Sequence, residues 1–320
     1  MSPNHRIKAT PTGKKSVNIN RDRAAAPAWP SYKGTAQVVG TSPSGRVTVY
    51  VDPTLGQPGL QNAQDLLNDA DRVVSANDAI FGTTGGPVSV VVFALGNATD
   101  GTGGADHMGC DYTTGAAIEV DASFSNSARV SALFEAELSE CSMNGNLCGL
   151  STGEALSRWC AAIISNNALS DFATAPQWAQ DGKPDFVDKT DPTDQNADST
   201  GCGMAFLSWL MSLSYSLDKI APAMVALGDA GTLAQLYANL TPDTTANAWP
   251  KFQSAIQALP NGVTSDNPFG AAQPAQTASA RAAKPPAGAA KAAAPTAICQ
   301  PKSKRLLPPN KVLDGSAKTA

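Results

Sequence analysis

Two different spacings of hydrophobic residues run along the chain, one typical of strands and the other of helices. Residues 46–53 alternate between apolar and polar side chains up to a proline, which is typical of a half-buried strand. Residues 87–95 are almost continuously apolar, so this strand needs cover on both faces of its sheet. A further strand is expected at 116–123.

The second spacing, in which apolar residues recur every three or four positions, predicts helices along most of the chain after residue 123. One earlier helix is expected, at 61–81, and the others at 126–143, 151–166, 204–217, 219–239 and 246–258. The order is therefore strand, helix, strand, strand and then helices. This order predicts an α+β fold with a small sheet packed on a helical C-terminal half.

The net charge of -4 conceals three segments of different character. Residues 1–32 contain six basic residues and one acidic residue, and residues 266–320 contain eight and two. The segment 33–265 between them has 9 basic and 24 acidic residues, so an acidic body lies between two basic ends. A nucleic-acid-binding core is therefore not expected, because such a core needs clustered positive charge.

The basic ends have the composition of disordered tails around a single domain at 33–265. Residues 271–297 are rich in Ala and Pro and offer few side chains large enough for a core. A small basic and apolar cluster follows around Leu306 and Leu307, for which docking and a solvated tail are both open. Either tail is a candidate for binding an unknown acidic protein partner.

Hydropathy also bears on where the protein is expected to be. No window has the roughly 18 apolar residues of a membrane span, and the N-terminus has no apolar segment typical of a signal peptide. The expected location is therefore cytoplasmic. In such a reducing compartment the six cysteines are expected to be buried thiols.

The distribution of glutamate is the most unusual feature of the composition. Only five of the 27 acidic residues are Glu, and four of these lie within twenty residues on two predicted helices. Structural roles account for them: Ser151 and Glu154 have the spacing of a capping box, and Arg158 is placed for a helical ion pair with Glu154. Glu135 is expected to face solvent, whereas Glu137 and Glu140 share one helix face.

The order of elements together with these glutamates resembles the zincin-type zinc metallopeptidases, in the gluzincin-like branch that contains the plant and bacterial basic secretory proteins. The family's H-E-x-x-H helix corresponds to residues 136–140, and its E-G-I-A-D helix to residues 154–158. Residues 200–207 and 232–241 are similar to later segments of the family, so the resemblance covers roughly 45–260. It implies a zincin-like fold in which Glu137 stands at the position of the general base.

The departures from the family motif decide what the resemblance implies for function. Ala136 and Glu140 stand where the family has its two zinc-binding histidines, and Arg158 replaces an Asp. Zinc sites need neutral imidazole or thiolate ligands, so the resemblance implies a pseudoenzyme without a cofactor, whose role is binding or scaffolding. The alternative is a metal-dependent hydrolase with Glu137 as base and with Glu140, Glu154 and His107 as ligands.

Two further segments are candidates for metal binding. His107 and Cys110 lie in a glycine-rich segment and, with Cys141 and Cys148, offer ligands for zinc or a thiol catalyst. Asp residues recur between 181 and 198 and offer oxygen ligands for calcium, although the spacing matches no EF-hand. For each segment the structural interpretation is preferred, namely local hydrogen bonding and a solvated loop. A third, weaker hypothesis for the whole chain is binding of anionic partners through the tails.

Overall fold

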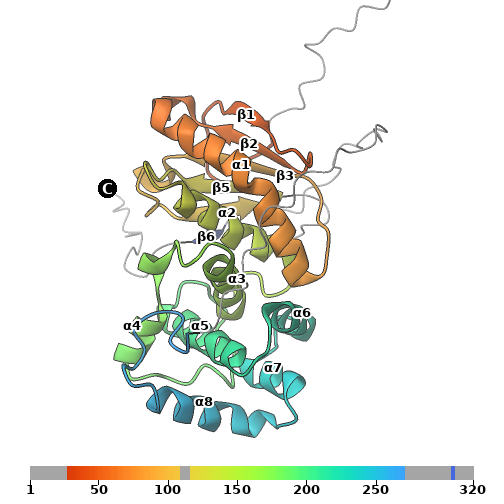
Figure 1. The fold of residues 1–320 in the computed structure, drawn as a ribbon, viewed down its shortest axis with the longest axis vertical. Helices are drawn as coiled ribbons and strands as arrows, with labels where there is room; N and C mark the ends of the chain where they lie inside the picture. Colours follow the sequence, from red (N-terminus) through yellow and green to blue (C-terminus); the bar gives the residue numbers. More distant parts are fainter. Residues whose placement is uncertain (1–26, 109–115, 271–303, 307–320) are drawn as a thin grey trace, which may run out of the picture.

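The computed structural model describes residues 27–108, 116–270 and 304–306. These residues form a six-stranded sheet with two long helices on one face, and a helical half below it (Figure 1). The strands, in spatial order, are β1 (Gln37–Thr41), β2 (Val47–Val51), β3 (Val88–Phe93), β5 (Ala116–Asp121), β4 (Ala105–Met108) and β6 (Lys304–Leu306). The predicted α+β class is confirmed.

The sheet is mixed. Strands β2, β3 and β5 are parallel, whereas β1, β4 and β6 pair in antiparallel orientation with their neighbours. The parallel centre is rich in Val because a strand buried on both faces needs apolar residues at every position. In the spatial order of the described strands, β4 is second from one edge of the sheet, and β6 is the edge strand.

Helices α1 (Gly56–Phe81) and α2 (Ser127–Ser142) cover one face of this sheet. The apolar side of α1 packs with residues of β2, β3 and β5 in a single hydrophobic cluster that also includes α2. The opposite face is covered by the segment before β1, where Trp29 and Tyr32 pack against Tyr50 and Val91. Glu119 anchors this segment, because its carboxylate accepts hydrogen bonds from the backbone N–H groups of both Ser31 and Tyr32.

The helical half has its own aromatic core. Its helices are α3 (Ser151–Ile164), α4 (Ala175–Gln180), α5 (Ala197–Ser212), α6 (Leu217–Leu227), α7 (Leu233–Leu240) and α8 (Ala248–Gln257). Trp159, Trp178, Phe206 and Phe252 are each fully buried there. Helix α3 packs against both α2 and α5 and thereby joins the two halves of the molecule.

The predicted tail boundaries are wrong at three places. Residues 27–32 belong to the folded body, since Trp29 and Tyr32 are buried. Residues 266–270 also belong to it, because Asp266 accepts hydrogen bonds from the backbone of Thr174 and Ala175. Residues 304–306 form β6, so the cluster around Leu306 is docked on the sheet. The rest of both predicted tails, and Leu307, lie outside the described residues.

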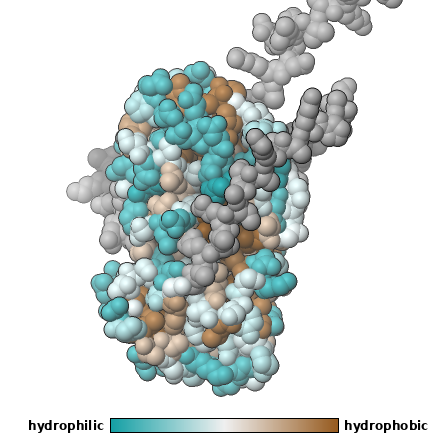
Figure 2. Space-filling model, in the orientation of Figure 1, coloured by the Kyte–Doolittle hydropathy of each residue, from teal (hydrophilic) through white to brown (hydrophobic). Residues whose placement is uncertain are grey.

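The surface of the described chain is largely polar. On the face drawn in Figure 2, hydrophilic residues alternate with small hydrophobic patches. Within the described ranges, Val38 and Leu213 are the large hydrophobic side chains that are exposed. None of the helices in these ranges combines the length and apolar character that a membrane span requires.

Candidate functional site

Strand β4 and helix α2 bring three of the predicted site residues together. His107 lies on β4, where side chains alternate between the faces, and its register partner on β5 is the buried Ile118. This face packs against α2, which presents Glu137 and Glu140 one turn apart. His107, Glu137 and Glu140 are named here the His107 cluster.

The contacts within the His107 cluster are direct. The Nδ1 atom of His107 lies 2.7 Å from Oε2 of Glu137 and 3.9 Å from Oε2 of Glu140. The Ser157 hydroxyl donates to Oε1 of Glu140 at 3.2 Å, so α3 also contributes to the cluster. The three side chains of the cluster are between 1% and 8% exposed, so the whole cluster is nearly closed to solvent.

Glu154, the fourth predicted residue, is bound by a protein cation. Its Oε1 accepts a hydrogen bond of 2.5 Å from Nε of Arg158, one turn later on α3. The Arg158 guanidinium also donates to the backbone carbonyl of Phe172 at 2.9 Å. Both side chains are less than a tenth exposed, so this predicted ion pair is a buried one. Arg158 is thus fixed on the carboxylate that the hydrolase hypothesis assigns to a metal.

The geometry of the His107 cluster is that of a hydrogen bond. Two ligands of one tetrahedral zinc, each at about 2.0 Å from it, stand about 3.3 Å apart. The separation of 2.7 Å between His107 Nδ1 and Glu137 Oε2 is shorter than this and is an ordinary hydrogen-bond distance. Among the described residues no group of three His, Cys, Asp or Glu side chains is placed to hold a metal ion.

The cysteines differ from the expected set of thiols. Cys141, Cys160 and Cys202 are buried thiols. Burial raises the pKa of the Cys202 thiol to about 12, so this thiol is a poor nucleophile at neutral pH. Cys148 is disulfide-bonded, so the expectation of a thiol is wrong there. Cys110 lies outside the described residues, and the proposed pair with His107 therefore cannot be placed.

The aspartates between 181 and 198 take part in local hydrogen bonds. Asp181 accepts one from Gln177, Asp185 from the backbone of Val187, and Asp191 from Asn196. These are contacts that order a loop and the start of α5, in which Asn196 caps the helix by accepting from Asp198 N. Calcium binding by this loop remains a hypothesis, and its candidate ligands are these aspartate carboxylates.

Glu135 does not face solvent, and this prediction is wrong. The side chain is fully buried, with Oε1 accepting a hydrogen bond of 3.0 Å from Ser139. Burial raises its pKa well above the ordinary value, and this effect outweighs the Ser139 hydrogen bond and the Arg72 charge. Burial therefore favours the protonated, neutral form of Glu135.

The predicted capping box at Ser151 and Glu154 is also wrong. Helix α3 begins at Ser151 itself, and Leu150 is its N-cap without a side-chain hydrogen bond. Glu154 consequently lies inside the first turn of α3, where its carboxylate accepts the hydrogen bond from Arg158. A capping box is found instead at α7, where Thr232 and Gln235 satisfy each other's backbone.

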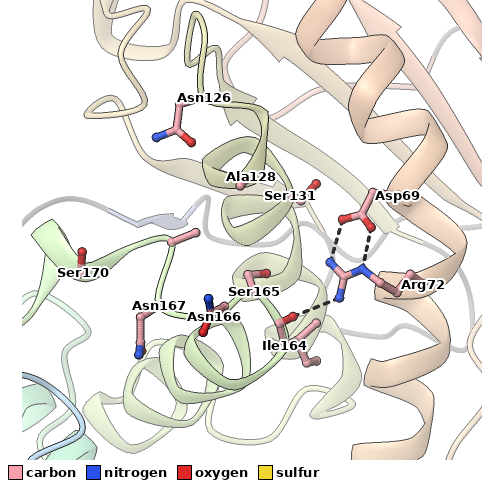
Figure 3. A pocket seen from close by; sticks show the side chains of 11 residues that line it. Asp69, Arg72, Asn126, Ala128, Ser131, Ile164, Ser165, Asn166, Asn167 and Ser170 are labelled. Atoms are coloured by element: carbon pink, nitrogen blue, oxygen red, sulfur yellow. Dashed lines mark hydrogen bonds and ion pairs between the residues drawn. The ribbon is translucent and has the colours of Figure 1, made fainter. Parts of the chain in front are cut away.

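A separate cavity of about 470 Å³ lies between α1, the start of α2 and the end of α3 (Figure 3). Its lining combines polar side chains such as Asn126 and Asn167 with apolar ones such as Ile164. Arg72 is held by both oxygens of Asp69 and donates to the carbonyl of Ile164 at 3.0 Å. The lining includes no residue of the His107 cluster, so this cavity does not lead to the predicted site.

Sequence reasoning missed strand β4 and the residue Ser157. The segment around His107 is glycine-rich and has no alternation, so its extended backbone depends on pairing with β5 and β6. Ser157 lies three residues after Glu154 on the same predicted helix, and this spacing places the two residues on one helix face. Comparison of the chain with models of protein families and with curated proteins gives no match.

Proposed function

We propose that the protein is a zincin-like pseudoenzyme, a non-catalytic protein whose role is binding or scaffolding. The observation that carries the proposal is the buried ion pair between Arg158 and Glu154, with an N–O distance of 2.5 Å. A permanent cation at this place opposes a divalent metal nearby and neutralises one of the proposed ligands.

The His107 cluster supports the same proposal. Its carboxylates are engaged with His107 and Ser157, and little of the cluster is exposed to a substrate. A hydrolase needs an open coordination position for water and substrate. A closed network of this kind instead stabilises the contact between β4, α2 and α3, which leaves the surface of the body for binding.

One observation favours a second candidate, the metal-dependent hydrolase. His107, Glu137 and Glu140 are close together although they lie on different elements, as that hypothesis requires. In this candidate Glu137 is the general base, while Glu140, Glu154 and His107 hold zinc or calcium. Glu154 becomes a ligand only after it leaves Arg158.

Hydrolysis of a peptide mixture, followed by mass spectrometry with and without added Zn²⁺, Mn²⁺ or Ca²⁺, tests the two candidates. The expected result is no metal-dependent cleavage, with Glu137→Gln indistinguishable from the wild type. Glu135→Gln is the matched control, because it makes the same change on the same helix away from His107. Cleavage that is lost in Glu137→Gln and kept in Glu135→Gln would overturn the proposal.

The redox state of Cys148 bears on the location of the protein. The disulfide at Cys148 is typical of oxidising compartments and weighs against the cytoplasmic location expected from the N-terminal sequence. Binding of an acidic partner through the basic ends is proposed for the chain as a whole.

A further inference from the structure

The cavity beside α1 has the size and the unpaired polar groups of a small-molecule site. Its volume of about 470 Å³ is within the range of cavities that hold such ligands. Helix α1 contributes Asp69 and Arg72 to the lining, and the start of α2 contributes Ala128 and Ser131. The end of α3 and the segment after it, residues 164–170, supply the rest (Figure 3).

Arg72 is held in a fixed orientation at this cavity. Its Nε and Nη2 atoms donate to the two carboxylate oxygens of Asp69, at 2.6 and 2.7 Å, and Nη1 donates to the carbonyl of Ile164 at 3.0 Å. Each Nη atom carries a second N–H, and neither has a hydrogen-bond partner among the described residues. The side chain is 42% exposed, so these remaining donors are available to a ligand.

Two serine hydroxyls of the lining also lack a partner. Ser131 is only 4% exposed, and its hydroxyl makes no hydrogen bond within the described part of the chain. The Oγ atom of Ser165 is buried and likewise has no partner there. Buried hydroxyls are nearly always hydrogen-bonded, because an unpaired one loses its bonds to water without replacing them. A ligand in the cavity supplies the missing partner to both.

Three amide side chains complete the polar part of the lining. Asn126 uses its Oδ1 atom to cap α2 through the backbone N–H of Arg129. Asn166 and Asn167 have left-handed backbone conformations, with φ of 51° and 58°, which Asn adopts more readily than most residues with a side chain. The amides of these two residues make no hydrogen bond to other described residues, so each offers a donor and an acceptor.

The charges of the lining cancel each other. Asp69 and Arg72 are its charged residues, and both oxygens of Asp69 are engaged with the guanidinium. An ionic ligand would lose hydration here without meeting an unpaired counter-charge. Hydroxyl groups of a neutral ligand can both donate to and accept from the free serines and amides. Ile164 and Ala168 add apolar surface for the C–H groups of such a ligand.

We propose that this cavity is a binding site for a neutral sugar of one or two rings. The sugar hydroxyls accept from Arg72 and pair with the hydroxyls of Ser131 and Ser165 and with the amides of Asn166 and Asn167. The inference goes beyond the proposed function, because it assigns a ligand class to a second site that shares no residue with the His107 cluster.

Saturation-transfer NMR of the full chain with a panel of neutral sugars, followed by calorimetric titration of those that bind, tests the proposal. The panel contains glucose, galactose, mannose, N-acetylglucosamine, maltose and lactose, with inorganic phosphate as the ionic comparison. We expect at least one sugar to bind and phosphate to show no binding at the same concentration. Binding of phosphate alone, or of no member of the panel, overturns the inference.

The double variant Asn166→Gly with Asn167→Gly locates the binding. It removes both amides and leaves a residue that adopts positive φ without strain, and we expect sugar affinity to fall at least about tenfold. Asn144→Gly is the matched control, because Asn144 has a φ of 54° and lies outside the lining. This control is expected to keep the affinity of the wild type, and equal affinities in the two variants contradict the proposed site.

Ser131→Ala gives a second variant that leaves the backbone of the loop unchanged. Loss of the buried hydroxyl is expected to weaken sugar binding by about threefold to tenfold. Ser142→Ala removes a buried hydroxyl from the same helix outside the cavity and is expected to leave the affinity unchanged. An unchanged affinity in Ser131→Ala contradicts the role assigned to this hydroxyl and with it the placement of the sugar.

The peptide-cleavage assay separates this inference from the proposed function. A chain that binds sugar and cleaves no peptide supports both. Sugar binding together with metal-dependent peptide cleavage overturns the non-catalytic function and keeps the sugar site. Absence of sugar binding from a chain that cleaves no peptide overturns the sugar site alone.

Discussion

The two sides of helix α2 stabilise buried carboxyl groups in different ways. On the side facing β4 and α3, Glu137 and Glu140 contact an imidazole and a hydroxyl. On the other side Glu135 receives one hydrogen bond from Ser139, and its pKa is raised by burial. Two residues apart on one helix, Glu137 has an imidazole as its partner, whereas burial shifts Glu135 toward its protonated form despite the Ser139 hydrogen bond.

The largest effect is expected where a buried carboxylate loses its cation. Arg158→Met leaves Glu154 charged and unpaired in the interior, and we expect the free energy of unfolding in urea to fall by about 3–5 kcal/mol. The double variant Glu154→Gln with Arg158→Met removes the unpaired charge and is expected to recover most of this loss. A fall as large in the double variant would mean that other contacts of the Arg158 side chain, including its hydrogen bond to the Phe172 carbonyl, matter more than its charge pair with Glu154.

Lys251→Met is the matched control for this prediction. Lys251 also forms a 2.5 Å ion pair, with Asp243, but its side chain is 56% exposed. Exposed pairs contribute little because water and salt screen them, so this variant is expected to change stability far less than Arg158→Met. Similar losses in both variants would contradict the distinction between buried and exposed pairs.

A smaller effect, dependent on pH, is expected at Glu135. Its pKa in the folded protein is raised above the ordinary value of 4.5, so the folded state holds its proton more strongly than the unfolded chain. The stability contributed by this group is fully present below the unfolded pKa and is lost as the pH rises through the folded pKa. Each unit of pKa difference corresponds to about 1.4 kcal/mol.

Glu135→Gln removes this titration. The variant is therefore expected to gain stability relative to the wild type as the pH rises above the ordinary pKa of 4.5, as measured by urea unfolding at a series of pH values. Asp218→Asn, which changes an exposed carboxyl group, serves as the control and is expected to show no such gain. A Glu135→Gln curve parallel to that of the wild type would show that Glu135 is ionised in the folded protein.

The smallest effect is expected at Glu137. The amide of Glu137→Gln keeps a hydrogen bond to the His107 ring, so the free energy of unfolding should change by no more than about 1.5 kcal/mol. Thermal unfolding followed by circular dichroism measures this change. A much larger loss would indicate that His107 and Glu137 form an ion pair with full charges, like the pair of Arg158 with Glu154, and would contradict this prediction.

The sequence predicts most helices and the central strands because their spacings reflect burial on one or both faces. It could not predict the environment of Glu135, since every residue of α2 from Arg129 to Ser142 is buried and a fully buried helix shows no polar side. The convergence of Glu137 with Glu140 was predictable from their spacing. The position of His107 beside them depends on β4, whose extended backbone is set by neighbouring strands far away in the sequence.

The pairing of β6 was not predictable for the same reason. Residues 304–306 show no strand spacing of their own, and the partner strand lies about 200 residues earlier in the chain. Only the charge pattern, in which a basic C-terminal segment follows an acidic body, favoured binding of this segment to the body. The distribution of charge thus indicated attraction, while the register that places Arg305 opposite Asp106 required the fold.

Elemental analysis of the purified full-length protein, dialysed after exposure to Zn²⁺, Mn²⁺ and Ca²⁺, tests the central claim most directly. If Arg158 and His107 are the partners of the buried glutamates, the protein retains none of these metals in stoichiometric amount, and Glu137→Gln with Glu140→Gln has the same metal content. One equivalent of metal per chain in the wild type, lost in that double variant, would contradict the account and identify the His107 cluster as a metal centre.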